Sequence, residues 1–274
     1  MLSVNTNTGA MIAVVFLNQT QGQMAQTQNA INTGLKVSSA KDDGATYAIA
    51  QNMRGDVAGY QAVTDSLNRG MSAVDVATSA GQSISDLLIE MKQKALAASD
   101  ASIDTNSRQA LNQDFVALRD QITTIVKNAV FNGFNLIDGS TTKITALASA
   151  DGTRRISVSA LTMSLTGNIV TIGSAGSIST LANASTMVKT IETSLTNVDA
   201  ALAKLSSGAK KFSIQLQFTQ QLSDTLSTGI GNLVDADMAK ESALLTSLQT
   251  KQQLGVQALS IANQAPSTIL SLFR

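Results

Sequence analysis

The chain contains no cysteine and no histidine among its 274 residues. Disulfides and thiol chemistry are therefore excluded, together with any Ser-His-Asp or Cys-His catalytic centre and any H-E-x-x-H zinc site. Two acidic pairs remain, Asp42 with Asp43 and Asp235 with Asp237. Neither pair has the glycine-framed spacing of a calcium loop, so the capping of helix starts is the favoured role. We predict no catalytic residue, no metal site, no cofactor and no enzymatic activity.

Charged, aromatic and proline residues are also scarce. Charged residues make up 14% of the chain and aromatics 3%, the formal net charge is zero, and Pro266 is the only proline. Without a block of like charge, neither nucleic acid nor an anionic membrane surface is favoured as a partner. The longest apolar run, residues 9–18, is about half as long as a bilayer span and lacks the features of a secretory signal, so we interpret it as one face of a helix.

What the chain does contain is helical periodicity. One series of apolar residues alternates spacings of three and four without a miss: Val188, Ile191, Leu195, Val198, Leu202, Leu205, Ala209 and Phe212. This spacing indicates a coiled-coil seam. The same helix is expected to run to about Thr228 and to break at the sequence GIGN, residues 229–232.

The N-terminal half offers partners for this seam. Its apolar stripe is Met53, Val57, Tyr60, Leu67, Met71 and Val74 and, after one slip, Ala77, Gly81, Ile84, Leu88, Met91, Ala95 and Ala98. A second helix with a Thr or Asn cap follows and carries Leu111, Phe115, Leu118, Ile122, Ile125 and Ala129. Three such helices can bury their stripes on one another, which predicts a mainly α, elongated bundle of long coiled-coil-like helices.

Between the two halves, residues 155–179 alternate apolar residues with Ser and Thr, which predicts two or three short antiparallel strands with a turn at residues 166–168. The ends of the chain carry thinner stripes: Ala10, Leu17, Met24 and Ile31, and Leu254, Ala258, Ile261 and Ala265. Such stripes do not offset the cost of ordering an isolated helix, so we expect the ends to be helical only against each other and against neighbouring subunits. Pro266 would kink or restart the last helix.

Three separated stretches resemble bacterial flagellins. They are NTGLKVSSAKDDGATYAIAQNMRG near the N-terminus, the later SLNRGMSAVDVATSAGQSISDLLIEMKQKALAASD with FNGFNLIDG, and LVDADMAKESALLTSLQTKQQLGVQALSIANQAPSTILSLFR at the C-terminus. The resemblance covers everything outside about residues 140–182, where larger flagellins insert outer domains. It implies a structural subunit that polymerises into the flagellar filament, the helical propeller for swimming.

The resemblance also implies a domain plan. Residues 1–41 and 233–274 would be paired terminal helices of the inner filament core, and residues 42–139 and 183–232 a helical rod domain with its core at the seam positions named above. Residues 140–182 would be a short β-hairpin region in place of a large outer domain. The implied polymerisation interface comprises Leu17, Met24, Ile31, Leu254, Ala258, Leu259 and Ile261. A hinge with inter-subunit charges would comprise Gly34, Lys36, Lys41, Asp42, Asp43, Gly44 and Arg54.

Partners and location follow from the same resemblance. We expect a homopolymer, alone or mixed with other flagellins, that contacts the flagellar export machinery, an export chaperone, and hook-associated and cap proteins. The protein would be extracellular, in the filament, and exported without a cleaved signal peptide. Two alternatives stay open: a flagellin-like protein of the hook-filament junction, and a flagellin with a metalloprotease insertion, for which the chain has no His.

Overall fold

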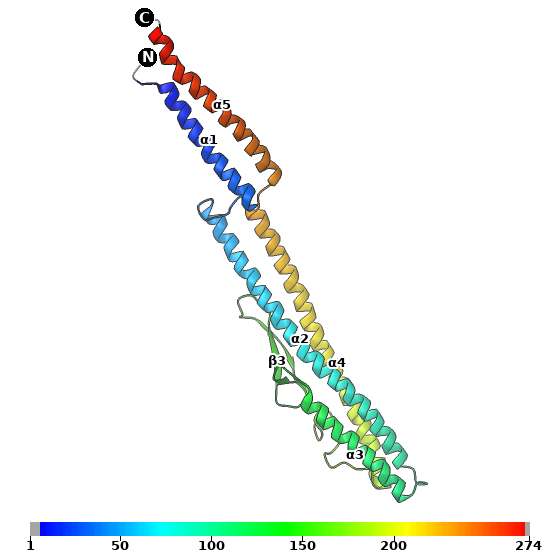
Figure 1. Ribbon diagram of the computed structural model, residues 1–274. Helices are drawn as coiled ribbons and strands as arrows, with labels where there is room; N and C mark the ends of the chain where they lie inside the picture. The colour runs from blue at the N-terminus through cyan, green and yellow to red at the C-terminus, as the bar shows by residue number, and fades with distance from the viewer. Residues whose placement is uncertain (1–5, 272–274) are drawn as a thin grey trace. The chain divides into compact units, whose positions relative to one another are not determined.

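The computed structural model describes residues 6–271, with side chains described as far as residue 264. Within that range lie the helices α1 (Thr8–Thr33), α2 (Gly44–Ala98), α3 (Thr105–Asn128), α4 (Leu181–Val234) and α5 (Met238–Ser271) (Figure 1). Two small antiparallel hairpins lie between α3 and α4 in the chain. The predicted fold class, mainly α with a small β-hairpin region, is confirmed. Residues 1–5 and 272–274 of the expected terminal domains lie outside the described residues.

The chain forms two compact units. One, called here the terminal unit, comprises the residues up to Gly55 and those from Thr225 onward, and the other, the central unit, comprises Asp56–Asp224. Both α2 and α4 contribute residues to each unit. The expected domain limits, after residue 41 and before residue 233, stay a prediction.

In the central unit, α2 buries an unbroken seam with alternating spacings of four and three. Its members are Val63, Leu67, Gly70, Val74, Ala77, Gly81, Ile84, Leu88, Met91, Ala95 and Ala98. The predicted slip after Val74 is wrong, because Gly70 rather than the half-buried Met71 occupies the seam position. A Cβ atom on Gly70 would lie 3.2 Å from the ring of Phe212, so a glycine here lets α4 approach closely.

Every second buried residue of the α4 seam lies one position before the residue that was predicted. The buried series is Ile191, Ser194, Val198, Ala201, Leu205, Gly208 and Phe212, whereas Val188, Leu195, Leu202 and Ala209 are half-buried. Small residues are buried because other segments come close to the helix there. A Cβ atom on Gly208 would lie 2.6 Å from Cγ1 of Val158. Small residues of α4 therefore lie in the buried seam, and the larger Leu195 and Leu202 pack beside it.

The predicted helix break at residues 229–232 is wrong, since α4 continues to Val234. Glycine lowers helix propensity, but a Cβ atom on Gly229 would lie 2.9 Å from the methyl group of Met53, so packing in the terminal unit favours glycine at this place. Helix α5 likewise continues past Pro266 to Ser271, which makes a restart of the last helix wrong.

Helix α3 is capped by Asp104, not by the predicted Thr or Asn. The Asp104 carboxylate accepts a hydrogen bond from the backbone N–H of Ser107 at 2.7 Å. Just inside the helix, Arg108 donates from Nε to the carbonyl of Ala98 at 2.9 Å and so satisfies the end of α2. Helix α3 buries Phe115, Ile122 and Val126, and Leu118 is half-buried.

The strands differ from the prediction in place and number. Strands β1 (Val130–Phe131) and β2 (Phe134–Asn135) form one hairpin, whose turn residues Asn132 and Gly133 both have positive φ. Strands β3 (Lys143–Leu147) and β4 (Arg155–Ser159) form the other. Residues 160–180 belong to no strand, although Thr166 does turn the chain with φ +66. The apolar residues of this segment pack onto the bundle instead of pairing, and Met163, Val170, Ile172 and Ile178 are buried.

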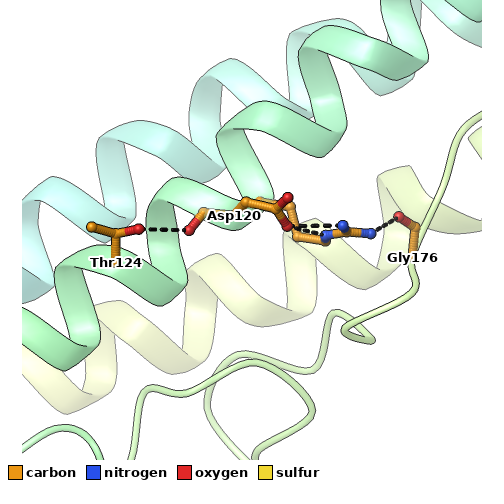
Figure 2. A network of polar contacts seen from close by, with 4 residues as sticks. Asp120, Thr124 and Gly176 are labelled. Atoms are coloured by element: carbon orange, nitrogen blue, oxygen red, sulfur yellow. Dashed lines mark hydrogen bonds and ion pairs between the residues drawn. The ribbon is translucent and has the colours of Figure 1, made fainter.

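Side chains from the helices hold this irregular segment in place. Arg119 of α3 donates to the carbonyl of Gly176 at 3.0 Å and forms an ion pair with Asp120 at 2.8 Å (Figure 2). The buried hydroxyl of Ser194 on α4 accepts a hydrogen bond from the backbone N–H of Thr171 at 3.0 Å. These contacts satisfy backbone groups that a strand partner would otherwise satisfy.

Candidate assembly surface

The terminal unit is built on an antiparallel pair of helices, α1 and α5. At one end Asn7 caps α1 by accepting from the backbone N–H of Ala10 at 3.0 Å, and its Nδ2 donates to the carbonyl of Ala262 at 2.6 Å. Further along, a Cβ atom on Gly255 would lie 3.4 Å from the side chain of Leu17. The start of α1 therefore lies beside the distal part of α5.

The two helices bury little of their own surface. Among their described side chains, only Thr27 and Ala30 of α1 and Leu248 of α5 are buried. One stripe per helix faces the partner helix, and the remaining faces point to solvent. An isolated pair with so narrow a contact is weakly stabilised, because burial of apolar area is the main favourable term in folding.

The predicted interface residues divide into two groups. Leu17, Met24, Ile31 and Leu259 are half-buried. Ala258 is exposed, as are Leu254 and Ile261, whose exposed fractions are 59% and 70%. The heptad stripe of α1 therefore lies at the partly covered side of the pair, and the exposed members on α5 are the ones available to another chain. Their role in polymerisation stays a prediction.

The largest exposed apolar surface of α1 was absent from the predicted interface. Met11, Ile12, Val15 and Phe16 have exposed fractions between 57% and 64%. The signal was present in the sequence, since these residues belong to the apolar run 9–18 that we interpreted as one face of a helix. The run is apolar on several sides, and a helix of that kind requires cover on more than one side.

Helix α5 also exposes large apolar side chains. Leu244 and Val256, also absent from the predicted set, have exposed fractions of 41% and 53%. Large apolar residues on both helices of the pair are thus exposed to solvent in a single chain. We define the assembly surface as Met11, Ile12, Val15, Phe16, Leu244, Leu254, Val256 and Ile261.

The predicted hinge lies where the two connecting loops pair with each other. Gly34 ends α1 in the left-handed region with φ +71, a conformation that favours glycine. The next residue, Leu35, forms an isolated β-bridge with Asp235, and the backbone N–H of Ala236 donates to the carbonyl of Gly34 at 2.8 Å. Gly44 begins α2 without a positive φ, so nothing in its backbone requires glycine.

Two of the predicted inter-subunit charges are engaged in their own loop. Asp42 accepts hydrogen bonds from the backbone and hydroxyl groups of Ser38 and Ser39, and these bonds hold its pKa below the ordinary value, with the Ser38 hydroxyl first. Asp43 accepts from the hydroxyl and backbone N–H of Thr46, which likewise lower its pKa. Both carboxylates therefore order the entry to α2, as capping groups do.

The remaining charges lie on the surface of the terminal unit. Lys36 donates from Nζ to the carbonyl of Asn232 at 3.0 Å, and so links the two loops. Arg54 reaches the side chain of Gln51 at 3.4 Å, and Lys41 is exposed. A contact between any of them and another subunit stays a prediction.

The described residues contain no group of three or more His, Cys, Asp or Glu side chains that could hold a metal ion. In the same part of the chain, no helix combines the length and the apolar character needed to cross a membrane.

Comparison with known proteins matches both halves of the chain. Residues 4–142 match the bacterial flagellin N-terminal helical region, and residues 188–273 match the bacterial flagellin C-terminal helical region. The chain is 53% identical over 272 residues to Flagellin FljM of Caulobacter vibrioides, covering 99% of this chain and 98% of the relative. It is 36% identical over 283 residues to a flagellin of Brucella melitensis, with 100% of both chains covered.

Solved structures show the same fold. The crystal structure of Bacillus cereus flagellin matches with a TM-score of 0.50 at 23% identity, over 56% of this chain and 88% of that one. A putative flagellar hook-associated protein from Vibrio parahaemolyticus matches with a TM-score of 0.57 at 14% identity, over 71% of this chain and 100% of that one. The two matched regions and the full-length relatives show that the chain belongs to the bacterial flagellin family, whose members are structural subunits that polymerise into the flagellar filament.

Proposed function

We propose that the assembly surface on α1 and α5 is where neighbouring subunits pack in the filament core. The observation that carries this proposal is the exposure of five large apolar residues within residues 11–16 of α1, Val14 included. Full burial of such a side chain contributes about 1.5 to 3 kcal/mol. Because the same contacts recur in every subunit, this surface supplies a large apolar driving force for polymerisation.

A charge at Val15, the most exposed large apolar residue of α1, tests the proposal. Val15→Asp places a carboxylate where neighbouring helices would bury it, at a cost of order several kcal/mol per copy. We expect the purified variant to form no filaments in electron micrographs, with unchanged helix content in the central unit. Gln19→Asp is the matched control, since Gln19 is an exposed polar residue on the same helix. Filaments of normal length from Val15→Asp would place the interface elsewhere.

Ile261→Asp tests the α5 side of the same surface. Ile261 is 70% exposed, whereas the neighbouring Leu259 is half-buried. A charge at Ile261 therefore leaves the helix pair intact and acts on contacts with other subunits. We expect loss of assembly for Ile261→Asp, and normal assembly would exclude this part of α5.

We also propose that the chain leaves the cell unfolded, through the flagellar export machinery and escorted by an export chaperone, and assembles outside between hook-associated and cap proteins. The chain has no cysteine and one proline, so disulfides and slow prolyl isomers place little constraint on an unfolded route. Loss of secretion in a strain lacking the flagellar export gate, with normal secretion when the general secretory route is blocked, is the expected result.

The filament role can be separated from a role at the hook-filament junction. We propose that this chain forms long filaments alone and mixes with other flagellins of the same cell. Expression in a strain without any other flagellin should give long filaments by electron microscopy. Short stubs confined to the hook would instead favour the junction protein. Mass spectrometry of filaments from a strain with all its flagellins measures the mixing.

A further inference from the structure

A cleft of about 410 Å³ lies in the central unit between β4 and α4. Ser157 and Ser159 line it from β4, and Lys204, Ser207 and Lys211 line it from α4. Both lysines are exposed, and three lysines without any acidic residue occur between residues 204 and 211. The cleft therefore combines a partly apolar lining with two exposed lysines, and it is open to another molecule.

The same face of α4 carries apolar residues beside the cleft. Ile214 and Phe218 follow Lys211 by three and seven residues, which places all three on one face of the helix. Their exposed fractions are 57% and 55%. An exposed aromatic residue next to lysines suits a partner surface that is both apolar and acidic.

The outer face of α2 has the opposite charge. Asp65, Asp75, Asp86 and Glu90 each follow a buried residue of α2 by two positions. Two residues correspond to about 200° around a helix, so these carboxylates point away from the buried side. Between residues 56 and 90, α2 carries five acidic residues and one basic residue, Arg69.

Within residues 6–271, none of these lysines and carboxylates forms an ion pair. In the part of the chain that the structure describes, the ion pairs are Lys92–Glu192, Lys94–Asp114 and Arg119–Asp120. The basic cleft and the acidic face are thus two unneutralised surfaces of opposite sign on the same protein.

We propose that the cleft face of α4, formed by Lys204, Lys211, Ile214 and Phe218, binds the acidic outer face of α2 in a second copy of this chain. The inference rests on the polymerisation of the family and adds a contact in the central unit to the assembly surface of the terminal unit. Two different, complementary surfaces on one chain make a heterologous contact, which generates a ring or an open helical assembly instead of a two-fold dimer. The open helical assembly is the one that fits a filament.

Charge reversal on each side tests the contact. Lys204→Glu with Lys211→Glu, and separately Asp75→Lys with Asp86→Lys, should each raise the monomer concentration needed for seeded assembly by about tenfold or more, since like charges then face each other. All four changes in one chain should restore assembly to within about threefold of the original protein. Sedimentation and electron microscopy measure both.

Lys189→Glu is the matched control, because Lys189 is exposed on α4 outside the cleft. The proposal would be overturned if the variant with Lys204→Glu and Lys211→Glu assembled at the same monomer concentration as the control. It would also be overturned if the variant with all four changes did not regain assembly. If circular dichroism shows that the Glu variant has lost helix, Lys204→Gln with Lys211→Gln replaces it. The monomer concentration needed for assembly of this Gln variant should rise several-fold. An unchanged concentration would count against the contact.

Salt separates this contact from the one on the terminal helices. Raising the ionic strength should lessen the defect of the charge-reversal variants, because exposed charges are screened. The Val15→Asp defect should persist, since it arises from burial of a charge in an apolar surface. An assembly defect of the charge-reversal variants that does not depend on salt would contradict the electrostatic contact. The proposal for the assembly surface on α1 and α5 would still stand.

Discussion

Phe212 and Phe16 are the same residue type in two helices of one chain, yet the exposed fraction is 0% for Phe212 and 63% for Phe16. Phe212 lies in the seam of α4, where α2 packs against it at Gly70. Phe16 belongs to α1, whose partner helix α5 covers another side. The central unit completes its core within one chain, whereas the terminal unit has apolar surface that other subunits can cover.

The difference arises from how each helix distributes its apolar residues. In α2 and α4 a continuous stripe of apolar residues is buried within the chain, although Ile214 and Phe218 of α4 stay exposed beside the cleft. In α1 the run 9–18 is apolar on several sides, and the rest of the helix is mostly Gln, Asn and Thr. Monomer stability should therefore reside mainly in the central unit, and assembly energy mainly in the terminal helices.

Matched phenylalanine truncations give the largest expected contrast. Phe212→Ala should lower the free energy of unfolding of the monomer by about 3 to 5 kcal/mol, because it leaves a cavity in a closed core. Phe16→Ala should change it by less than about 0.5 kcal/mol and reduce filament yield instead. Urea unfolding followed by circular dichroism measures the first quantity, and pelleted filament the second. Similar losses of monomer stability from both variants would contradict the division.

Matched glycine substitutions test the same contrast on a smaller scale. Gly208→Ala places a methyl group 2.6 Å from Val158 Cγ1, which should destabilise the central unit by about 1 to 3 kcal/mol. The added methyl group of Gly22→Ala in α1 would have no described atom within 4 Å apart from its own helix backbone and chain neighbours, so this change should stabilise the helix by about 0.5 to 1 kcal/mol. Thermal unfolding measures the first change, and amide hydrogen exchange in α1 the second. A stabilising Gly208→Ala would show that the hairpin moves away easily.

One polar atom in the central core gives a third test. Thr219 is 1% exposed, and its hydroxyl has no hydrogen-bond partner among the residues that the structure describes. Thr219→Val keeps the shape and removes an unsatisfied buried group, so the free energy of unfolding should rise by about 1 kcal/mol. Thr219→Ser retains the hydroxyl and removes a methyl group, so it should lower that free energy. A destabilising valine would reveal that the hydroxyl is satisfied in solution.

The smallest effect concerns acid. Hydrogen bonds from the Ser149 hydroxyl and then from Thr153 lower the pKa of Asp151 from 3.8 to about 2. Because the folded pKa is the lower one, the carboxylate stabilises the β3–β4 hairpin above about pH 4, and this contribution is lost as the pH falls through about 2. Asp151→Asn should therefore differ from the original protein at pH 5 and converge with it towards pH 2.

Thermal unfolding between pH 5 and pH 2 measures this convergence. Asp199→Asn is the control, since no hydrogen bond or ion pair in the described part of the chain involves the Asp199 carboxylate, which is exposed on α4. A constant difference between Asp151→Asn and the original protein across this range would exclude the carboxylate as its source.

Local pattern and composition were enough to predict several properties of this protein. The spacing of apolar residues predicts the long helices, because a helix repeats every 3.6 residues whatever surrounds it. Ile191, Val198 and Leu205, which this spacing places in the seam, are buried. The absence of Cys and His excludes whole classes of chemistry. The three quoted motifs identify the family.

Only the tertiary structure decided which small residues are buried and which large ones are exposed. Gly70 and Gly208 occupy seam positions because another segment comes within contact distance of their backbone, and a residue's own hydrophobicity contains no information about that distance. The hairpin register pairs residues 143–147 with 155–159, a non-local choice that alternation alone does not specify. Likewise, Phe16 is apolar but uncovered, because burial depends on what a neighbour covers as well as on the residue itself.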